Sequence, residues 1–480
     1  MFDFFYVEIS VDNYLAFKVY SGFIFVLDLL LFTPYLQRDF GVAYQANSFI
    51  KTKFRAILFW LVWFAGSVGL MLPYLNWLAP LILAIIFRYF YIYSRGTNLF
   101  RGGGAVGMFP AFIATSIFIV ELMLFNGFSW VAVTLFLNFM LFHVGIVTLC
   151  AGIYKLTAGY LRGEGLEYAL HNHMWSYWGF FLKGRPLPHQ NLLWLVNCWI
   201  AVQQTLIGLL MVWPWTREYG TSLLSLGFFA LFFTLKLGNL CLLVVAYSML
   251  FLNFEGVYLG YLANQISLEV SAFPAAEQIL PGIFTWLAIS YIAVKALQYA
   301  QFYFHFSLPK KIKLIVEKIG FYAPILIWRV FSKDIVNFYI KVEELDKQGV
   351  THRLNPDTFY NPNARGIFAK IRFFHVAESC VLSSIFLSVR YDPDNFPEAV
   401  SKLKRYSDTL WDQMLCSTNE LAFTYTKIIK QGGKMEFIDV EKWTLVNGNV
   451  VREQLTTELS IYENESPFLR PLGKFGSYEK

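Results

Sequence analysis

Long apolar runs dominate the first 301 residues of the chain. A helix that crosses the hydrocarbon core of a bilayer needs about 20 mainly apolar residues, because every backbone amide there must be satisfied within the helix. Runs of this kind occur at residues 18–36, 54–72, 75–93, 106–125, 130–153, 191–213, 222–252 and 281–301. The run at 222–252 is too long for one straight crossing, so it predicts either a strongly tilted helix or a break near Gly238. We therefore expect about eight membrane spans, or about nine if that run is broken.

The rest of the chain has a different pattern, with frequent charges and short amphipathic elements. Residues 336–345 are typical of a strand, and helical periodicity predicts an amphipathic helix at 397–415. A strand meander is expected at 422–455, with hairpin turns at Gly432-Gly433 and Asn447-Gly448. These elements predict a small α+β domain outside the bilayer.

The composition agrees with this division and excludes several classes of protein. Hydrophobic residues make up 56% of the chain and charged residues 15%, whereas soluble domains are about one quarter charged. The net charge of +6 is not gathered on one tail, which argues against a nucleic-acid partner. The cysteines are far apart without metal-ligand spacing, so we expect neither a disulfide framework nor a metal site. The predicted fold is an all-α polytopic membrane bundle (1–301) with a C-terminal α+β extramembrane domain (302–480).

Among the ionisable residues, Asp28, Glu121, His143 and Lys236 fall inside apolar runs. Charge in a bilayer is costly, and such residues by default indicate function. The alternative is structural, because polar side chains also pair across helices, here with a neighbour such as Asn138 or Asn239. Lys236 has no adjacent acid, so it needs a partner from another helix, a water-filled cavity or a neutral amine.

The most informative stretch is residues 151–175, where a long apolar helix ends. Ala151 and Gly152 are small enough to permit close approach by another helix, and Lys155 lies one turn beyond them. The acids Glu164 and Glu167 and the imidazoles His171 and His173 follow.

Two interpretations of this stretch remain open. A lysine desolvated by aromatic neighbours has its charged form disfavoured, so the group can form a proton-handling site with Lys155 as the base. Alternatively, Lys155 extends to the lipid headgroups while Glu164 and Glu167 point into water.

The run from Lys155 to Tyr168 resembles the signature of the vitamin K-dependent gamma-glutamyl carboxylase family, within the wider HTTM (horizontally transferred transmembrane) domain group. The matching positions are Lys155, Leu156, Ala158, Tyr160 (where the family usually has Trp), Gly163, Glu167 and Tyr168. Upstream, residues 94–104 (SRGTNLFRGGG) resemble a paired-glycine loop of HTTM-type proteins. The likeness covers residues 18 to about 300.

The resemblance implies a membrane enzyme of the carbon–carbon lyase type. Its base deprotonates a reduced naphthoquinone, a vitamin K hydroquinone-like cofactor, and the oxygenated product removes the gamma proton of a glutamate in a peptide or protein substrate. Lys155 matches that base, and the implied catalytic group also contains Glu167, His171 and His173. Tyr160, Lys236 and His143 are the expected cofactor-binding residues. The chain departs from the family pattern in its smaller extramembrane region and in Lys236, where the family has a histidine in the corresponding helix.

Two other functions are compatible with the sequence. A looser likeness to lipase maturation factors, at residues 237–239, implies a non-enzymatic maturation or assembly factor. A transporter would use the intramembrane ionisable residues, but no inverted repeat is evident. In each case we expect a multi-pass protein surrounded by membrane lipids, of the bacterial inner-membrane type. The oligomeric state stays open.

Overall fold

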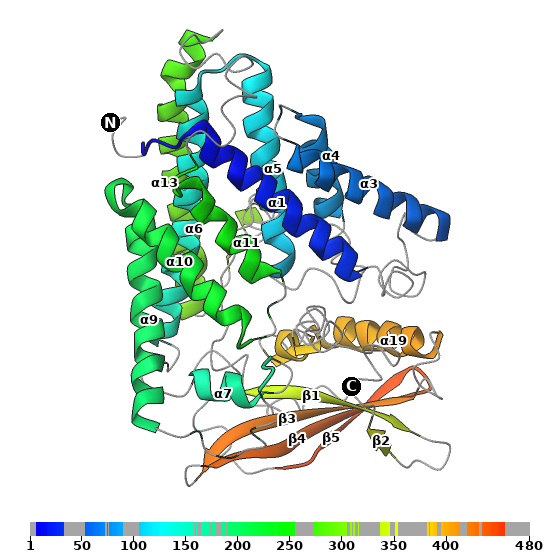
Figure 1. Ribbon diagram of the computed structural model, residues 1–480. Helices are drawn as coiled ribbons and strands as arrows, with labels where there is room; N and C mark the ends of the chain where they lie inside the picture. Colours follow the sequence, from blue (N-terminus) through cyan, green and yellow to red (C-terminus); the bar gives the residue numbers. More distant parts are fainter. Residues whose placement is uncertain are drawn as a thin grey trace.

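The computed structural model supports a helical membrane protein with a small C-terminal sheet (Figure 1). It describes residues 6–32, 53–72, 74, 76–89, 105–157, 160, 165–172, 175–178, 182, 185, 187, 190–235, 237, 239–254, 273–304, 308–309, 311–312, 315, 337–345, 351–353, 382–383, 385–390, 395–412, 420–431 and 434–456.

Five of the described helices are long and apolar enough to cross a membrane. They contain the spans Val11–Leu30, Phe54–Met71, Trp130–Leu156, Asn191–Val212 and Pro274–Leu297. The helices are α1 (Val11–Phe32), α3 (Lys53–Met71), α6 (Trp130–Thr157), α9 (Gln190–Val212) and α13 (Pro274–Phe304). Two further apolar helices, α4 (Leu78–Phe87) and α5 (Ala105–Phe125), occupy the predicted third and fourth runs. The membrane class of the fold is supported, and the number of spans stays a prediction.

Helix α6 is the central helix of the bundle, since 72% of its apolar window is buried against 17% for α13. It packs closely on α9 through glycines. A Cβ added at Gly152 would lie 2.4 Å from the backbone nitrogen of Thr205, and one at Gly208 would lie 2.3 Å from that of Leu149. The prediction that Gly152 permits close approach by another helix is confirmed. The rest of α9 presents large apolar side chains outward, as a lipid-facing helix does.

The apolar run at 222–252 is broken. Helix α10 (Arg217–Phe232) ends before the predicted Gly238, which lies outside the described residues, and α11 (Leu240–Ala246) begins after it. A short 3-10 helix, η8 (Tyr247–Leu250), continues α11. The segment between α10 and α11 is anchored by an isolated β-bridge from Leu235 to Ser176. Of the two alternatives that the sequence left open, the structure has the break.

The C-terminal domain is an antiparallel five-stranded sheet with the order β2-β1-β3-β4-β5. The strands are β1 (Phe338–Leu345), β2 (Thr351–Arg353), β3 (Leu421–Gln431), β4 (Lys434–Val446) and β5 (Asn449–Gln454). Helix α19 (Phe396–Asp412) covers one face, where Leu403 and Tyr406 pack with Phe423 of β3. The predicted turn at Asn447-Gly448 is confirmed, since both residues have positive φ. The turn predicted at Gly432-Gly433 lies outside the described residues.

Alternate side chains of the same strands bind the sheet to the membrane helices. Tyr339, Ile428 and Met435 belong to one hydrophobic cluster with the buried residues of the bundle. The seven-residue helix α7 (Gly165–His171) lies between the ends of the membrane helices and the strands (Figure 1). Just after α7, the Asn172 side-chain amide donates to the Phe338 carbonyl oxygen at 2.7 Å. The two parts of the chain are therefore packed together through α7.

Candidate functional site

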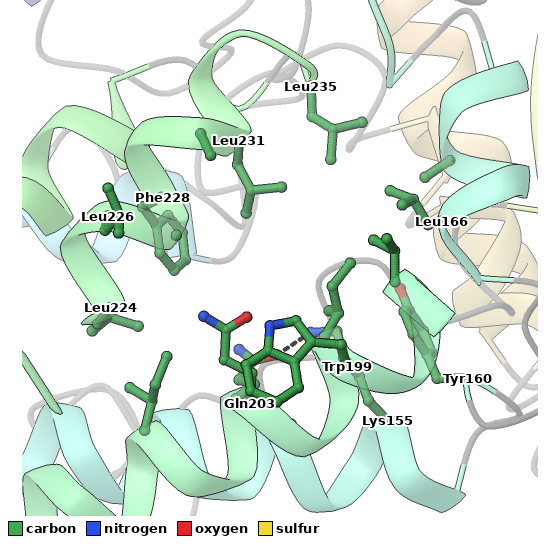
Figure 2. Close-up of a pocket in the computed structure, with 17 residues that line it drawn as sticks. Lys155, Tyr160, Leu166, Trp199, Gln203, Leu224, Leu226, Phe228, Leu231 and Leu235 are labelled. Atoms are coloured by element: carbon green, nitrogen blue, oxygen red, sulfur yellow. Dashed lines mark hydrogen bonds between the residues drawn. The ribbon is translucent and has the colours of Figure 1, made fainter. Parts of the chain in front are cut away.

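A cavity of about 370 Å³ lies where the C-terminal end of α6 meets α7, α9 and α10 (Figure 2). This volume falls in the range of small-molecule sites. Its walls are mostly apolar, with polar groups from a lysine, a tyrosine and two glutamines. The lining residues are Lys155, Tyr160, Leu166, Ala169, Val196, Trp199, Ile200, Gln203, Gln204, Ile207, Leu224, Leu226, Gly227, Phe228, Ala230, Leu231 and Leu235.

Among the residues that line this cavity in the described part of the chain, Lys155 alone has a charged type of side chain. It is buried, with 4% of its surface exposed. It lies in the last turn of α6, where the small Gly152 brings α9 close. As a result its Nζ donates a hydrogen bond to the Gln204 amide oxygen, at 2.5 Å. The Nζ also lies over the ring of Tyr160, 5.7 Å from the ring centroid. Lys155 therefore does not extend to the headgroups, and that alternative is wrong for it.

Tyr160 is held against α7 by a glycine. A Cβ added at Gly165 would lie 2.5 Å from the Tyr160 ring, so only glycine lets the ring pack there. Leu166 and Ala169 of α7 line the same cavity, and the Leu166 backbone N–H donates to the Asn197 side-chain oxygen of α9 at 2.6 Å. The structure places Tyr160 and Lys155 in the lining of the same cavity.

Glu167 and His171 lie on α7 beside the cavity, but neither lines it. Glu167 is almost fully buried, with 1% exposed, and pairs with Nζ of Lys430 on β3 at 2.7 Å. The two ring nitrogens of His171 lie 2.9 and 2.8 Å from the backbone oxygens of Glu167 and Arg185. Glu167 thus does not point into water, as one alternative held. It connects the membrane domain to the sheet.

His143, another predicted site residue, does not line the cavity. His143 is also on α6, about 18 Å along the helix axis from Lys155. Its ring lies between those of Phe112 and Tyr291, with centroids 4.8 and 4.6 Å away. His173, Lys236 and Glu164 lie outside the described residues. Within the described ranges, no group of three His, Cys, Asp or Glu side chains is placed to hold a metal ion.

Two of the intramembrane acids have polar partners across helices. Glu121 of α5 forms an ion pair with Lys18 of α1 at 2.8 Å, and both side chains are fully buried. Its carboxylate also accepts from the Tyr14 hydroxyl at 3.0 Å and from the Asn76 backbone N–H at 2.7 Å. Asp28 accepts a hydrogen bond from Asn239, one of the two asparagines proposed from the sequence as neighbours of the intramembrane residues.

Sequence reasoning missed Lys18, because it stands at the very edge of a predicted span, and Arg217, because it follows one. Arg217 is buried and donates to the Asn138 side-chain oxygen at 2.5 Å. Sequence reasoning also missed Gln203 and Gln204, although a signal was present: two adjacent amides lie inside an otherwise apolar membrane run.

Comparisons with known proteins add no assignment. The chain matches no protein-family model, no curated protein sequence and no solved structure.

Proposed function

We propose that this chain is an integral membrane enzyme in which the Lys155 amine acts as a general base toward a lipid-soluble molecule with an acidic hydroxyl, of the hydroquinone type. The observation that carries the proposal is the buried Lys155 amine, which faces a cavity with apolar walls. A ring with an apolar tail suits such walls, and its hydroxyl needs a polar group at one end of the cavity.

The partner of the amine supports a role as base. Gln204 presents an amide oxygen, which accepts a hydrogen bond from a neutral amine as well as from an ammonium. Of the residues that line the cavity in the described part of the chain, none is an aspartate or glutamate that would hold the ammonium as an ion pair. A general base must also lie within hydrogen-bond reach of its proton, and a ligand in the cavity satisfies this condition. In the proposed step the hydroxyl O–H bond breaks, an N–H bond forms on Lys155, and the hydroquinone anion remains.

The resemblance to gamma-glutamyl carboxylases gives the proposal its most specific form. The hydroquinone would then be a reduced naphthoquinone, the final substrate a glutamate of a peptide or protein, and the enzyme a lyase. The support is that Lys155 and Tyr160, two residues of the signature, line one cavity. The membrane would be a plasma membrane of the bacterial inner-membrane type, in which such a cofactor dissolves.

The experiment uses the full chain in lipid nanodiscs under anaerobic conditions. The probe is a 1,4-naphthohydroquinone with an isoprenoid tail, and its absorbance reports whether the bound form is neutral or anionic. We expect the anion spectrum with the wild-type protein and its loss in Lys155→Met. The matched control is Lys295→Met, which removes a buried amine of α13 that does not line the cavity.

An anion spectrum of equal strength in Lys155→Met contradicts the proposal. If the probe does not bind at all, the non-enzymatic alternative becomes the better one. A maturation or assembly factor would then lose its function on deletion of residues 302–480 and keep it in Lys155→Met.

A further inference from the structure

The geometry points to a ligand with two polar atoms on its head and one flexible apolar tail. Lys155 and Gln203 hold the head, and the ligand enters sideways from the bilayer between α9 and α10. The space at Gly227 sets the thickness of the tail that the cavity accepts. This inference rests on the proposed function and specifies its ligand. It concerns recognition and access rather than proton transfer.

Gln203 supplies the second polar contact. It lines the cavity on α9, next in sequence to the Gln204 that already accepts from Lys155. Figure 2 shows the Gln203 side chain extending from α9 into the space between α9 and α10. Its amide has no hydrogen-bond partner among the residues that the structure describes. An amide left unsatisfied among apolar side chains is unfavourable, so a ligand oxygen that bonds to it is stabilised there.

The side of the cavity formed by α9 and α10 is open toward lipid. Trp199 and Leu226 line the cavity and are at the same time 58% and 65% exposed. The neighbouring exposed side chains on these two helices are also large and apolar: Leu192, Leu195, Val202, Leu206, Leu223, Phe229 and Phe233. A surface of this composition faces the hydrocarbon of the bilayer. A ligand dissolved in the membrane therefore reaches Lys155 without passing through water.

Gly227 provides space along this route. Glycines in membrane helices usually let a second helix approach, as Gly152 does toward α9. At Gly227, in contrast, an added Cβ meets no atom within 4 Å, although the residue lines the cavity. No packing contact accounts for a glycine there, and any side chain at this position projects into open space. We therefore assign this space to the apolar tail of the ligand.

The test compares two probes on the full chain in nanodiscs: 1,4-naphthohydroquinone with an isoprenoid tail and the same ring without one. In Gly227→Leu the dissociation constant of the tailed probe rises by about tenfold, whereas that of the ring alone changes by less than about twofold. Gln203→Leu weakens both probes. Gly282→Leu on α13, where an added Cβ also meets nothing within 4 Å, changes neither.

Equal binding of the tailed probe to wild type and Gly227→Leu overturns the inference, and so does equal weakening of both probes in that variant. Gly227→Ala gives a milder version that adds one methyl group to open space and keeps the helix intact. The readout is affinity, so it is separate from ionisation of the hydroquinone. Tail selectivity without an anion spectrum would refute Lys155 as a base and leave the binding site in place.

Discussion

Two buried lysines of this protein differ in what they face. Lys18 is fully buried and forms an ion pair with Glu121, and it also donates to the Tyr74 carbonyl oxygen at 2.7 Å. Lys155 is almost as buried, but its partner is the amide oxygen of Gln204 and its surroundings include a cavity. The first amine is enclosed by groups that match its charge, and the second faces space that a ligand can occupy. Burial alone therefore does not distinguish the two lysines, whereas the chemistry of their partners does.

The Lys18 site has the features of a structural cross-link. The Glu121 carboxylate of α5 accepts from donors of α1 and of the segment before α4, so this carboxylate joins three parts of the bundle. Each donor and acceptor at this site has a partner within the protein, and nothing in the arrangement requires a ligand.

Loss of this ion pair should have the largest effect on stability. Glu121→Gln leaves the Lys18 ammonium buried without its counter-charge, so we expect a loss of about 3–5 kcal/mol in the free energy of unfolding. Denaturant-induced unfolding in mixed micelles measures it. A Glu121→Gln protein as stable as the wild type would show that the pair is not a cross-link.

The next largest effect should come from the contact that positions Lys155. A leucine at Gly152 would collide with the backbone of Thr205 and push α6 away from α9, at a cost of about 2–3 kcal/mol. The same unfolding assay measures this cost, and probe binding should weaken because Gln204 moves away from Lys155. Gly282→Leu on α13 is the control, since its side chain also enters open space and the residue does not line the cavity. Full probe affinity in Gly152→Leu would show that binding in the cavity does not depend on the α6–α9 contact.

The smallest effect on stability should come from Lys155 itself. Lys155→Met keeps an unbranched side chain that is one heavy atom shorter and removes one hydrogen bond to Gln204, so the free energy of unfolding should change by less than about 1 kcal/mol. The free energies of unfolding of Lys155→Met and Glu121→Gln, measured in the same assay, compare the two lysine sites directly. A loss as large as that of Glu121→Gln would make Lys155 a structural residue like Lys18.

Much of the fold could be predicted from the sequence because it depends on periodicity. The five long spans, the strand at 336–345 and the turn at Asn447-Gly448 follow from local patterns of apolar and turn residues. For the run at 222–252 the same patterns left a tilted helix and a break open, and the structure has the break. The close contact at Gly152 also followed, since small residues on an apolar helix indicate an interface.

The candidate site was only partly predictable, because its partners come from distant parts of the chain. Lys155 was identified as buried or interfacial, but its pairing with Gln204 depends on how α9 packs against α6. Glu167 was expected near Lys155 from its spacing in the sequence, whereas the structure pairs it with Lys430 of the sheet. No local pattern contains the information that a residue more than two hundred positions away completes an ion pair.

The shared helix α7 has a consequence for the C-terminal sheet. One side of α7 contributes Leu166 and Ala169 to the cavity, and Glu167 on the same helix holds the sheet. Suppose that a ligand in the cavity changes how firmly α7 packs on the strands. Linkage then requires that a second ligand, bound at the strands, changes the affinity of the cavity for the first ligand by the same factor by which the first changes the affinity for the second. A molecule that binds at the sheet would in that case alter how tightly the cavity holds a ligand of its own.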